Sequence, residues 1–317
     1  MKKNILVTGG AGFIGSNIVK SLLNDENVDK VRVLDNLATG YWQNLEEFAK
    51  HPKFDFVFGD IRDKETCFKA TIGMDAVCHQ AALGSVPRSV ADPITTNAIN
   101  IDGTLNIFWA AKENGIKRVV YASSSSVYGD NPILPKKEEN TGNPLSPYAV
   151  TKAVSERYSS VFGNLYGMEM IGLRYFNIFG PNQHPGGAYA AVLPLFINAL
   201  REDKAPTIFG DGLTSRDFTF VENAVNANKK ALFSENPLAY NQVYNIACGE
   251  RTTLIEMFDL LKQAAGKEHI QPNFAPERAG DIKHSLADIS KATELLGYEP
   301  TVKINEGMKI TFDEFKW

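Results

Sequence analysis

The chain contains 317 residues, of which 44 % are hydrophobic and 22 % charged, and its formal net charge is −4. This composition is typical of a soluble globular enzyme, and the length allows one large core or two cores in contact. The negative net charge gives no reason to expect binding to nucleic acid, and no apolar run approaches membrane-spanning length. The three cysteines have no metal-ligand spacing and are typical of reduced thiols. We therefore expect a cytoplasmic protein with neither a nucleic-acid nor a membrane partner.

The first half of the chain alternates short apolar runs with amphipathic stretches. The runs are rich in β-branched and aromatic residues and predict strands at Ile5–Val7, Val31–Leu34, Phe54–Phe58, Ala76–Cys78, Val119–Ala122 and Met170–Arg174. The stretches between them, such as Ser16–Leu23 and Thr104–Asn114, predict helices. This order predicts an α/β fold, a doubly wound parallel (Rossmann) sheet with helices on both faces and ligands at the carboxyl ends of the strands.

The pattern changes after about Gly180, where the segment Pro181–Gly187 is rich in proline and glycine and predicts a loop. The later stretches predict helices at Ala190–Arg201, Leu254–Ala265 and Ser290–Leu296, turns within Thr207–Arg216, and a strand at Val243–Ile246. We expect a Rossmann domain at residues 1–177, to which the chain returns around 218–246. Residues 178–317 would then form mainly a second, smaller α+β substrate domain.

A glycine-rich segment follows the first predicted strand directly. Gly9, Gly12 and Gly15 have the Gly-x-x-Gly-x-x-Gly spacing. Gly9 permits a tight turn, Gly12 lets a diphosphate approach the backbone, and Gly15 lets the next helix pack closely on the strand. The diphosphate would lie at a helix N-terminus, where N–H groups and the helix dipole favour negative charge. The motif between a strand and a helix therefore predicts a dinucleotide site.

Two acidic residues follow the next two predicted strands. Asp35 ends the second strand, 20 positions beyond Gly15. A carboxylate there accepts hydrogen bonds from the adenosine ribose and repels a 2′-phosphate. Because no Arg or Lys occurs at positions 36–39, the pattern favours NAD over NADP. Asp60, after the third strand, is a candidate for contact with the adenine, although a solvated turn aspartate explains it nearly as well.

A candidate acid–base pair lies at the start of a predicted helix, with Ser146 as N-cap and Pro147 as first residue. Tyr148 and Lys152 are at i and i+4, so their side chains lie on one face. Tyrosine is a poor base at pH 7, but a neighbouring ammonium and a positive nicotinamide ring each favour the phenolate and lower its pKa. The serine run Ser123–Ser126 adds small hydroxyls at the carboxyl end of a strand.

Together the glycine triad, Ser124 and the Tyr148-x-x-x-Lys152 pair resemble the extended short-chain dehydrogenases/reductases. Further stretches narrow the resemblance to nucleotide-sugar enzymes; they are Asp35–Gly40, Leu173–Pro181, Ile208–Gly212, Ser215–Phe218 and Arg278–Asp281. Three more are similar to bacterial UDP-N-acetylglucosamine 4-epimerases; they are Gly84–Ser89, Asn143–Tyr148 and Gly187–Val192. The resemblance covers almost the whole chain.

This resemblance implies roles for the catalytic residues. Tyr148 would be the base for the sugar 4-hydroxyl, and Lys152 would lower its pKa and hold the nicotinamide ribose. Ser124 would bind the sugar O4, with Ser125 and Ser126 close enough to remain alternatives. The implied activity is 4-epimerisation with tightly bound NAD, interconverting UDP-N-acetylglucosamine and UDP-N-acetylgalactosamine, and also UDP-glucose and UDP-galactose, through a transient 4-keto sugar.

The resemblance also implies two sets of binding residues. The residues expected at the cofactor are Gly9, Gly12, Phe13, Ile14, Gly15, Asp35, Asn36, Asp60, Ile61, Gln80, Ala81, Ala82, Tyr148, Lys152 and Tyr175. The residues expected at the substrate are Ser85, Ser124, Ser125, Ser126, Asn177, Ala191, Val192, Phe209, Arg216, Arg278, Asp281 and Ser285. The two arginines also suit a diphosphate on chemical grounds, because planar guanidinium groups bind phosphate oxygens in pairs.

Other functions of the same fold remain open. A 4,6-dehydratase needs an acid–base pair after the catalytic hydroxyl, and Ser125 and Ser126 cannot supply it. An epimerase or decarboxylase acting on UDP-glucuronate needs a group for the sugar carboxylate, and Arg88 is a candidate. A non-catalytic regulator that senses NAD would typically lack the tyrosine, whereas Tyr148 and Lys152 are both present.

The choice between hexose and N-acetylhexosamine is expected to depend on Ser285. In the family, the residue four positions after the Arg-x-Gly-Asp aspartate limits the space beside C2, and glucose-specific members carry Tyr there. Ser285 is much smaller, which favours the N-acetylated substrate, although a small loop residue without this role is the simpler alternative.

Metal binding and assembly are also addressed by the sequence. The five histidines show no metal-ligand spacing, and His79 is expected to be a packed structural residue. Helices around Thr95–Asn114 and Ser146–Phe162 resemble those that pair in dimers of the family. Apolar residues such as Ile107, Phe108, Val154 and Tyr158 could supply the contact of a homodimer, and burial within the monomer explains them equally well.

Overall fold

The computed structural model describes residues 2–184, 192–277 and 283–315. Its largest element is a seven-stranded sheet with the strand order β11-β6-β5-β4-β1-β2-β3, in which every neighbouring pair is parallel. The strands are β1 (Lys3–Thr8), β2 (Val28–Asp35), β3 (Phe54–Phe58), β4 (Ala76–His79), β5 (Arg118–Ser124), β6 (Glu169–Tyr175) and β11 (Gln242–Ile246). The strand order reverses between β1 and β4, and this is where open α/β sheets bind ligands.

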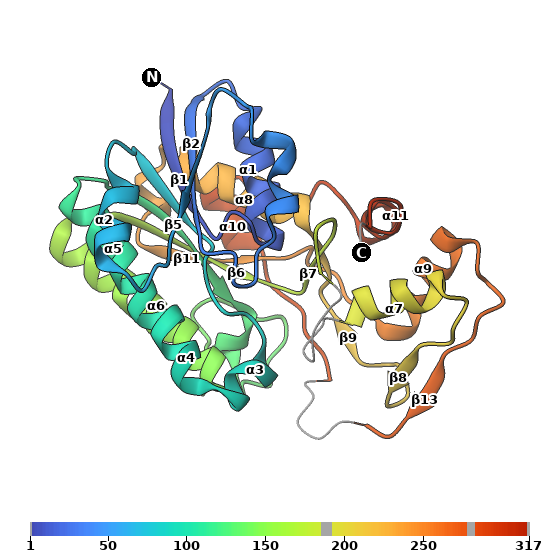
Figure 1. Cartoon of the computed structure of the whole chain (residues 1–317). Coiled ribbons are helices and arrows are strands. Elements are labelled where there is room, and N and C mark those ends of the chain that lie inside the picture. The colour runs from blue at the N-terminus through green and yellow to red at the C-terminus, as the bar shows by residue number, and fades with distance from the viewer. Residues whose placement is uncertain (1, 185–191, 278–282, 316–317) are drawn as a thin grey trace.

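Helices cover both faces of this sheet (Figure 1). One face packs against α1 (Phe13–Leu23), α8 (Val221–Phe233) and α10 (Ser290–Leu296), and the other against α2 (Lys64–Thr71), α5 (Thr104–Glu113) and α6 (Pro147–Tyr166). Along β1, Ile5 and Val7 belong to the first core and Leu6 to the second, because successive strand residues point to opposite faces. A strand buried on both faces is apolar throughout, which explains the continuous apolar runs of the sequence.

Two short helices lie between β4 and α5 in the chain. They are α3 (Val86–Ala91) and α4 (Pro93–Asn97), which follow β4, and a π-helical stretch (Ala98–Gly103) joins α4 to α5. Both α3 and α4 pack against α6. They therefore lie between the end of β4 and α6, the helix that holds Tyr148.

A smaller region lies beside the sheet, at the right of Figure 1. It contains three helices, α7 (Val192–Arg201), α9 (Leu254–Ala265) and α11 (Ile304–Asp313). Its strands form two-stranded pairs: β7 (Ile178–Phe179) with β10 (Thr219–Phe220), β8 (Thr207–Phe209) with β13 (Asn273–Ala275), and β9 (Ser215–Arg216) with β12 (Thr252–Thr253). A separate core that includes Phe196, Phe258 and Met308 holds these elements together.

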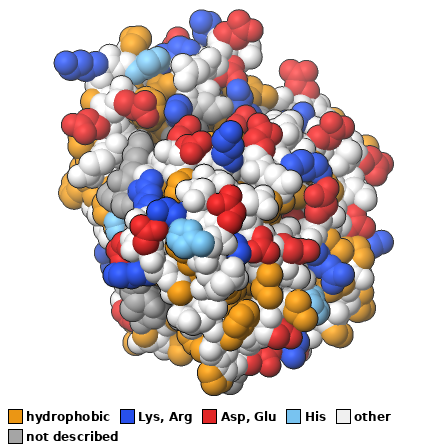
Figure 2. Space-filling model, turned by 90° about the vertical axis from the view of Figure 1, so that its right-hand side faces the viewer, with side chains coloured by type: hydrophobic (Ala, Val, Ile, Leu, Met, Phe, Trp, Pro, Cys, Tyr) orange, Lys and Arg blue, Asp and Glu red, His pale blue; other side chains and the backbone are white. Residues whose placement is uncertain are grey.

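Figure 2 shows the face of the molecule that lies at the right of Figure 1, where acidic and basic side chains are interspersed.

The predicted fold class is confirmed, and every predicted strand is present. The helices α9 and α10 have the predicted limits, whereas α2, α8 and α11 were not predicted. Of the two explanations given for Ile107 and Phe108, burial within the monomer is correct, because both are 0 % exposed in the core between the sheet and α5. Among the described residues, no helix has the length and apolarity that crossing a membrane requires.

Candidate active site

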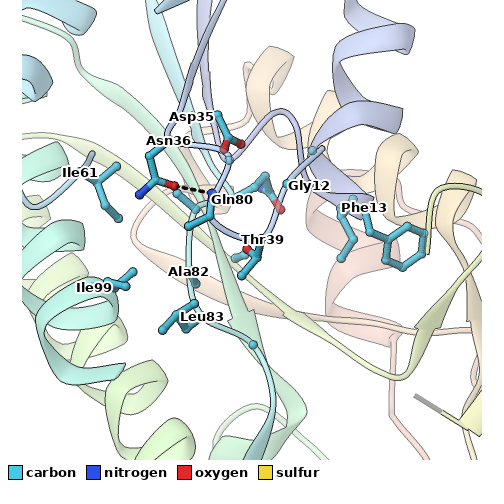
Figure 3. Close-up of a pocket in the computed structure, with 18 of the residues that line it drawn as sticks. Gly12, Phe13, Asp35, Asn36, Thr39, Ile61, Gln80, Ala82, Leu83 and Ile99 are labelled. Atoms are coloured by element: carbon cyan, nitrogen blue, oxygen red, sulfur yellow. Dashed lines mark hydrogen bonds between the residues drawn. The ribbon is translucent and has the colours of Figure 1, made fainter. Parts of the chain in front are cut away.

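A cavity of about 680 Å³ runs along the carboxyl ends of the strands (Figure 3). All the residues that the sequence predicted for the cofactor line it: Gly9, Gly12, Phe13, Ile14, Gly15, Asp35, Asn36, Asp60, Ile61, Gln80, Ala81, Ala82, Tyr148, Lys152 and Tyr175. The sequence did not predict several other lining residues: Ala38, Thr39, Gly40, Tyr41, Leu83, Gly84, Ile99, Ala122, Gln183 and His184. Residues 38–41 and 83–84 continue segments that contain predicted residues, whereas Ile99, Ala122, Gln183 and His184 lie elsewhere in the chain.

The glycine-rich turn between β1 and α1 is one wall of the cavity. Gly9 has φ +69°, and a Cβ added to it would lie 2.6 Å from the amide nitrogen of Ala81. A Cβ on Gly15 would lie 2.1 Å from the carbonyl oxygen of Gly9. Gly12 is the N-cap of α1 and provides no side-chain hydrogen bond to the first turn. The first amides of α1 therefore face a site where an anion would be stabilised by them and by the helix dipole.

Asp35 closes β2 at the opposite side of this turn. Its carboxylate accepts hydrogen bonds from the amides of Ala11 (2.9 Å) and Leu37 (2.8 Å). Burial raises its pKa, and the two amides oppose that effect. Asp35 thus fixes the glycine-rich turn against the loop after β2, and its oxygens retain lone pairs for further donors.

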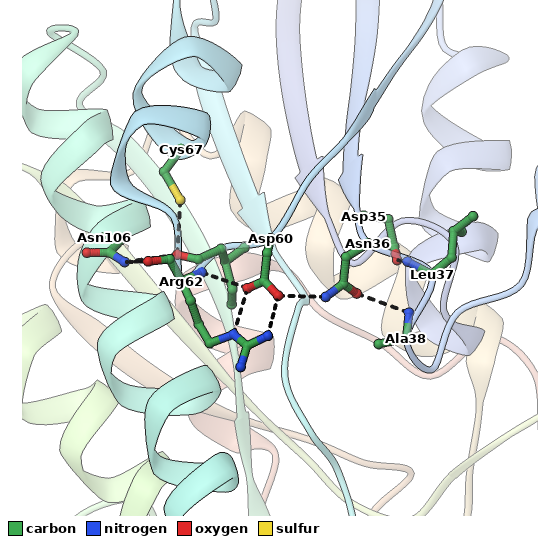
Figure 4. Close-up of polar contacts among 9 residues, drawn as sticks. Asp35, Asn36, Leu37, Ala38, Asp60, Arg62, Cys67 and Asn106 are labelled. Atoms are coloured by element: carbon green, nitrogen blue, oxygen red, sulfur yellow. Dashed lines mark hydrogen bonds and ion pairs between the residues drawn. The ribbon is translucent and has the colours of Figure 1, made fainter.

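Asp60 is more constrained than a solvated turn aspartate (Figure 4). It accepts two side-chain hydrogen bonds from Arg62, at 2.7 Å and 3.0 Å, and one from Asn36 at 2.8 Å. The hydrogen bonds from Arg62 are the main reason why its pKa falls to about 2. Asp60 is therefore ionised, and its charge is balanced by the guanidinium of Arg62.

Tyr148 and Lys152 face the cavity from the first turns of α6. The helix begins as predicted, because the Ser146 hydroxyl accepts from the amide of Ala149 (3.1 Å). The amide of Tyr148 donates to the hydroxyl of Ser89 on α3 (3.0 Å). The Lys152 ammonium donates to the carbonyl oxygen of Ala122 (2.8 Å) and lies 5.9 Å from the Tyr148 ring.

In the protein alone, burial is the main influence on the pKa values of this pair. Burial raises the pKa of Tyr148, and its hydrogen bond with Ser124 opposes that effect without overcoming it. Burial lowers the pKa of Lys152 to about 8, against the attraction of Glu156. The protein groups alone therefore keep Tyr148 protonated, and the phenolate needs a further positive charge nearby.

The serine run divides into different environments. Ser123 donates to Glu156 (2.5 Å), which also forms a buried ion pair with Arg174 (2.8 Å). Ser124 contacts Tyr148. Ser125 and Ser126 lie in the 3₁₀ turn that follows β5, and the Ser126 hydroxyl is buried without a hydrogen-bond partner. Of the three serines proposed for the sugar O4, Ser124 is the one in contact with Tyr148.

A second cavity, of about 510 Å³, lies in the smaller region. Four residues that the sequence predicted for the substrate line it: Asn177, Val192, Phe209 and Arg216. Its other walls are largely apolar, with Phe179, Phe196 and Phe218 among them. Gln183 lines this cavity and the first one, so the two cavities are adjacent there.

The remaining predicted substrate residues have other positions. Ala191, Arg278 and Asp281 lie outside the described residues. Ser85 is the N-cap of α3 and lines neither cavity, although the adjacent Gly84 lines the first. The amide of Ser285 donates to the carbonyl oxygen of Ser215 (3.1 Å), which places Ser285 beside the strand of Arg216 but outside the lining of both cavities.

Asp217 joins the segments around Arg216, and the sequence did not single it out beyond its motif. It is fully buried, and its carboxylate accepts from the amides of Cys248 (2.9 Å), Gly249 (3.1 Å) and Ala287 (3.3 Å). Burial raises its pKa to about 6. The end of β11 and the segment after Ser285 are thus tied to β9 by one side chain.

His79 is the packed structural residue that the sequence predicted. Its ring nitrogens contact the hydroxyls of Thr8 (2.7 Å) and Thr104 (3.0 Å). Burial and the charge of Lys152 lower its pKa to about 3, so it is neutral. Among the described residues, no group of three or more His, Cys, Asp or Glu side chains could hold a metal ion.

Comparisons with known proteins agree with this geometry. Residues 5–247 match the NAD-dependent epimerase/dehydratase family. The chain is 38 % identical to a UDP-glucose 4-epimerase of Mycolicibacterium smegmatis over 98 % of both chains. It is 42 % identical, with a TM-score of 0.93, to the UDP-N-acetylglucosamine 4-epimerase from Methanobrevibacter ruminantium M1 in complex with UDP-N-acetylmuramic acid, covering 99 % of this chain and 98 % of that one. For the Thermus thermophilus UDP-glucose 4-epimerase in complex with NAD, the identity is 36 %, the TM-score 0.87 and the coverage 98 % of both chains.

Proposed function

Because the chain belongs to the NAD-dependent epimerase/dehydratase family and is a UDP-sugar 4-epimerase, we propose that it interconverts UDP-N-acetylglucosamine and UDP-N-acetylgalactosamine, and also UDP-glucose and UDP-galactose. The observation that carries the 4-epimerase chemistry is the contact of Tyr148 with Ser124 beside Lys152, at a cavity lined by the glycine motif. The N-acetylated substrate is supported by the 42 % identity to a UDP-N-acetylglucosamine 4-epimerase and by the small side chain of Ser285.

The residues of the first cavity fit NAD. The uncapped amides at Gly12 suit the diphosphate, and side chains at Gly9 and Gly15 would fill the space of the turn. The carboxylate of Asp35 suits the ribose hydroxyls of NAD and would repel the 2′-phosphate of NADP. To test this, the nucleotide that copurifies with the protein is released by denaturation and identified. NAD(H) is expected, and NADP(H) as the main species would overturn the assignment.

In the proposed reaction, the protein supplies proton transfer and orientation. Tyr148 takes the proton of the sugar 4-hydroxyl, Ser124 holds the same oxygen, and the Lys152 ammonium favours the phenolate. When bound, NAD would supply the reversible hydride chemistry at C4, and its positively charged ring would favour the phenolate of Tyr148. Since Tyr148 returns the same proton, no other acid is needed once the 4-keto sugar has turned over.

The decisive experiment compares substrates directly. The purified protein is incubated with UDP-N-acetylglucosamine and with UDP-glucose, and the epimers are separated. We expect both to be converted, with the higher kcat/KM for the N-acetylated substrate. Conversion of UDP-glucose alone would overturn the N-acetylhexosamine assignment, and conversion of neither would overturn the proposal as a whole.

We further propose a homodimer that uses α4, α5 and α6. Large apolar side chains on these helices remain in solvent, with Ile94 81 % and Leu165 69 % exposed, and Trp109, Val150 and Val161 also exposed. These residues, rather than the buried Ile107 and Phe108, are the candidates for the contact. Sedimentation at micromolar concentration should show a dimer that Leu165→Arg dissociates, whereas a monomeric native protein would contradict the proposal.

A further inference from the structure

Three functional side chains follow one another at intervals of four residues along α6: Tyr148, Lys152 and Glu156. Side chains with this spacing lie on one face of a helix, about one turn apart. The helix packs against β5 and β6. Lys152 is 6 % exposed, and the side chain of Glu156 is 13 % exposed. Glu156 is therefore a largely buried carboxylate one turn beyond the lysine.

The carboxylate of Glu156 is fixed by both of these strands. One of its oxygens accepts from the hydroxyl of Ser123 (2.5 Å) and from Nε of Arg174 (2.8 Å), and the other accepts from Nη2 of Arg174 (2.8 Å). Ser123 and Arg174 are register partners near the carboxyl ends of β5 and β6, so their side chains leave the sheet on the same face. Three hydrogen bonds thus hold the carboxylate in one position.

The end of β5 also holds Lys152. The ammonium of Lys152 donates to the carbonyl oxygen of Ala122, the residue before Ser123 (2.8 Å). This carbonyl is neutral, whereas burial disfavours the charged lysine and lowers its pKa to about 8. The attraction of Glu156 opposes that effect. The ammonium therefore depends on a nearby negative charge to persist above neutral pH.

Other titratable groups surround Lys152 and Glu156. They are Arg88 on α3, His79 on β4, Tyr121 on β5, Tyr128 in the turn after β5, Glu138 in the segment before α6, Tyr148 on α6, Arg174 and Tyr175 on β6 and, farther along the cavity, Asp35 and Asp60 after β2 and β3. His79 is neutral, and burial raises the pKa of each tyrosine. Glu138 accepts from the amide of Asn245, and burial raises its pKa. The carboxylate that acts on Lys152 is that of Glu156.

From this arrangement we propose that Glu156 is a positioning residue of the reaction, the counter-charge that keeps Lys152 an ammonium beside Tyr148. The inference rests on the proposed role of Lys152 and adds to it a residue that does not touch the substrate. Arg174 and Ser123 hold the carboxylate in place. Removal of the carboxylate charge should lower the pH at which Lys152 loses its proton, and with it the upper pH limit of turnover.

The test measures kcat/KM for 4-epimerisation from about pH 6 to about pH 10, with the UDP-sugar that the native enzyme converts faster. Glu156→Gln keeps the size of the side chain and removes its charge. The alkaline decline should lie about one pH unit lower than in the native enzyme, the low end of the effect of a nearby opposite charge. Glu156→Asp keeps the charge and should restore most of the native profile. A decline that Glu156→Gln leaves in place would overturn the inference.

Glu169→Gln is the matched control. Glu169 pairs with Arg118 (2.6 Å) at the first residues of β6 and β5, the opposite end of the same two strands. This variant also breaks an ion pair between strand and carboxylate, and it should leave the pH profile in place. An equal shift in Glu169→Gln and Glu156→Gln would overturn the inference, because it would show a general loss of stability.

A double variant covers the case in which an uncompensated Arg174 prevents Glu156→Gln from folding, because an unpaired buried charge is strongly destabilising. Glu156→Gln combined with Arg174→Gln removes both charges. It should move the alkaline decline in the same direction by a smaller amount, because repulsion from Arg174 is then absent. An unmoved decline in the double variant would overturn the inference as well.

Chemical labelling of Lys152 separates the inference from the proposed function. Competitive acetylation across the same pH range, followed by peptide mass spectrometry, measures the pKa of Lys152 without turnover, because only the neutral amine reacts. The midpoint should fall by about one pH unit in Glu156→Gln even if neither UDP-sugar is epimerised, in which case the proposed function alone fails. An unmoved midpoint would overturn the inference whatever the activity.

Discussion

The two cavities use different means of recognition. The first is built largely from backbone, with a turn that requires Gly9 and Gly15 and amides that Asp35 holds in place. The second is built from side chains, with phenylalanines and Arg216 on short strands and helices. The first site depends on residues whose spacing is fixed along one turn, whereas the second depends on how distant segments pack. A substitution where the two cavities are adjacent should therefore affect turnover. A substitution within one cavity should affect binding of the ligand of that cavity alone.

The largest effect is expected from Tyr148→Phe, at the end of the first cavity. It removes the proton acceptor without removing the ring, so kcat should fall by roughly 10²- to 10⁴-fold. Retained NAD and an unchanged Kd for UDP would show that both sites are intact. Near-native turnover would mean that another group is the base.

Arg216→Gln should affect the second cavity alone. Loss of a charge-assisted hydrogen bond to a phosphate costs about 1.5–3 kcal/mol, so KM for the UDP-sugar should rise roughly 10- to 150-fold. The copurified NAD should be unchanged, as measured by absorbance after denaturation. A loss of NAD with this variant would contradict the separation of the two sites.

Ser285→Tyr tests whether substrate choice depends on the segment beside β9. If the new ring fills the space beside C2, overpacking costs about 1–3 kcal/mol, so kcat/KM for UDP-N-acetylglucosamine should fall by about one to two decades. UDP-glucose should be spared. A parallel loss on both substrates would indicate a stability defect, and because Ser285 lines neither cavity, an unchanged ratio would remove it from the specificity determinants.

The smallest effect is a dependence on pH that follows from Lys152. Burial lowers the pKa of this lysine to about 8, so the ammonium is present below that pH and lost above it. Turnover should therefore decline above about pH 8, approaching tenfold per pH unit. Circular dichroism at each pH checks that the protein stays folded, and a rate that keeps rising through pH 9.5 would contradict the role of the ammonium.

The sequence was most informative where the local spacing of residues determines the structure. The strands were predicted because burial on both faces makes them apolar throughout, and all the predicted cofactor residues line one cavity because they follow those strands. The helix α8 was missed because its buried face contains Asn223 and Asn228, which interrupt the apolar periodicity. Their amides bond to distant groups, Asn223 to the carbonyl of Val302 and Asn228 to the hydroxyl of Tyr175. No local pattern reveals such partners.

Contacts between distant segments also determine the surroundings of Asp217 and the pKa of Tyr148, and the sequence did not reveal them. Asp217 belonged to a recognised motif, but its three amide donors come from the residues just after β11 and from the segment after Ser285, which only the fold brings together. The environment of Tyr148 was predicted from its neighbour Lys152, yet burial proved the larger influence on its pKa. Desolvation depends on everything packed around a group, and helix spacing does not report it.

The covering of the sheet has a consequence for synthesis on the ribosome. One face of the sheet is covered by α1 and also by α8 and α10, which come from residues 221–233 and 290–296, and the edge strand β11 comes from residues 242–246. A nascent chain that has just completed β6 therefore presents much of an apolar sheet face and an unpaired edge to the solvent. Such surfaces aggregate or recruit chaperones until the missing segments emerge. We expect the fragment 1–177 to be insoluble when made alone, although it contains the entire glycine motif and Tyr148.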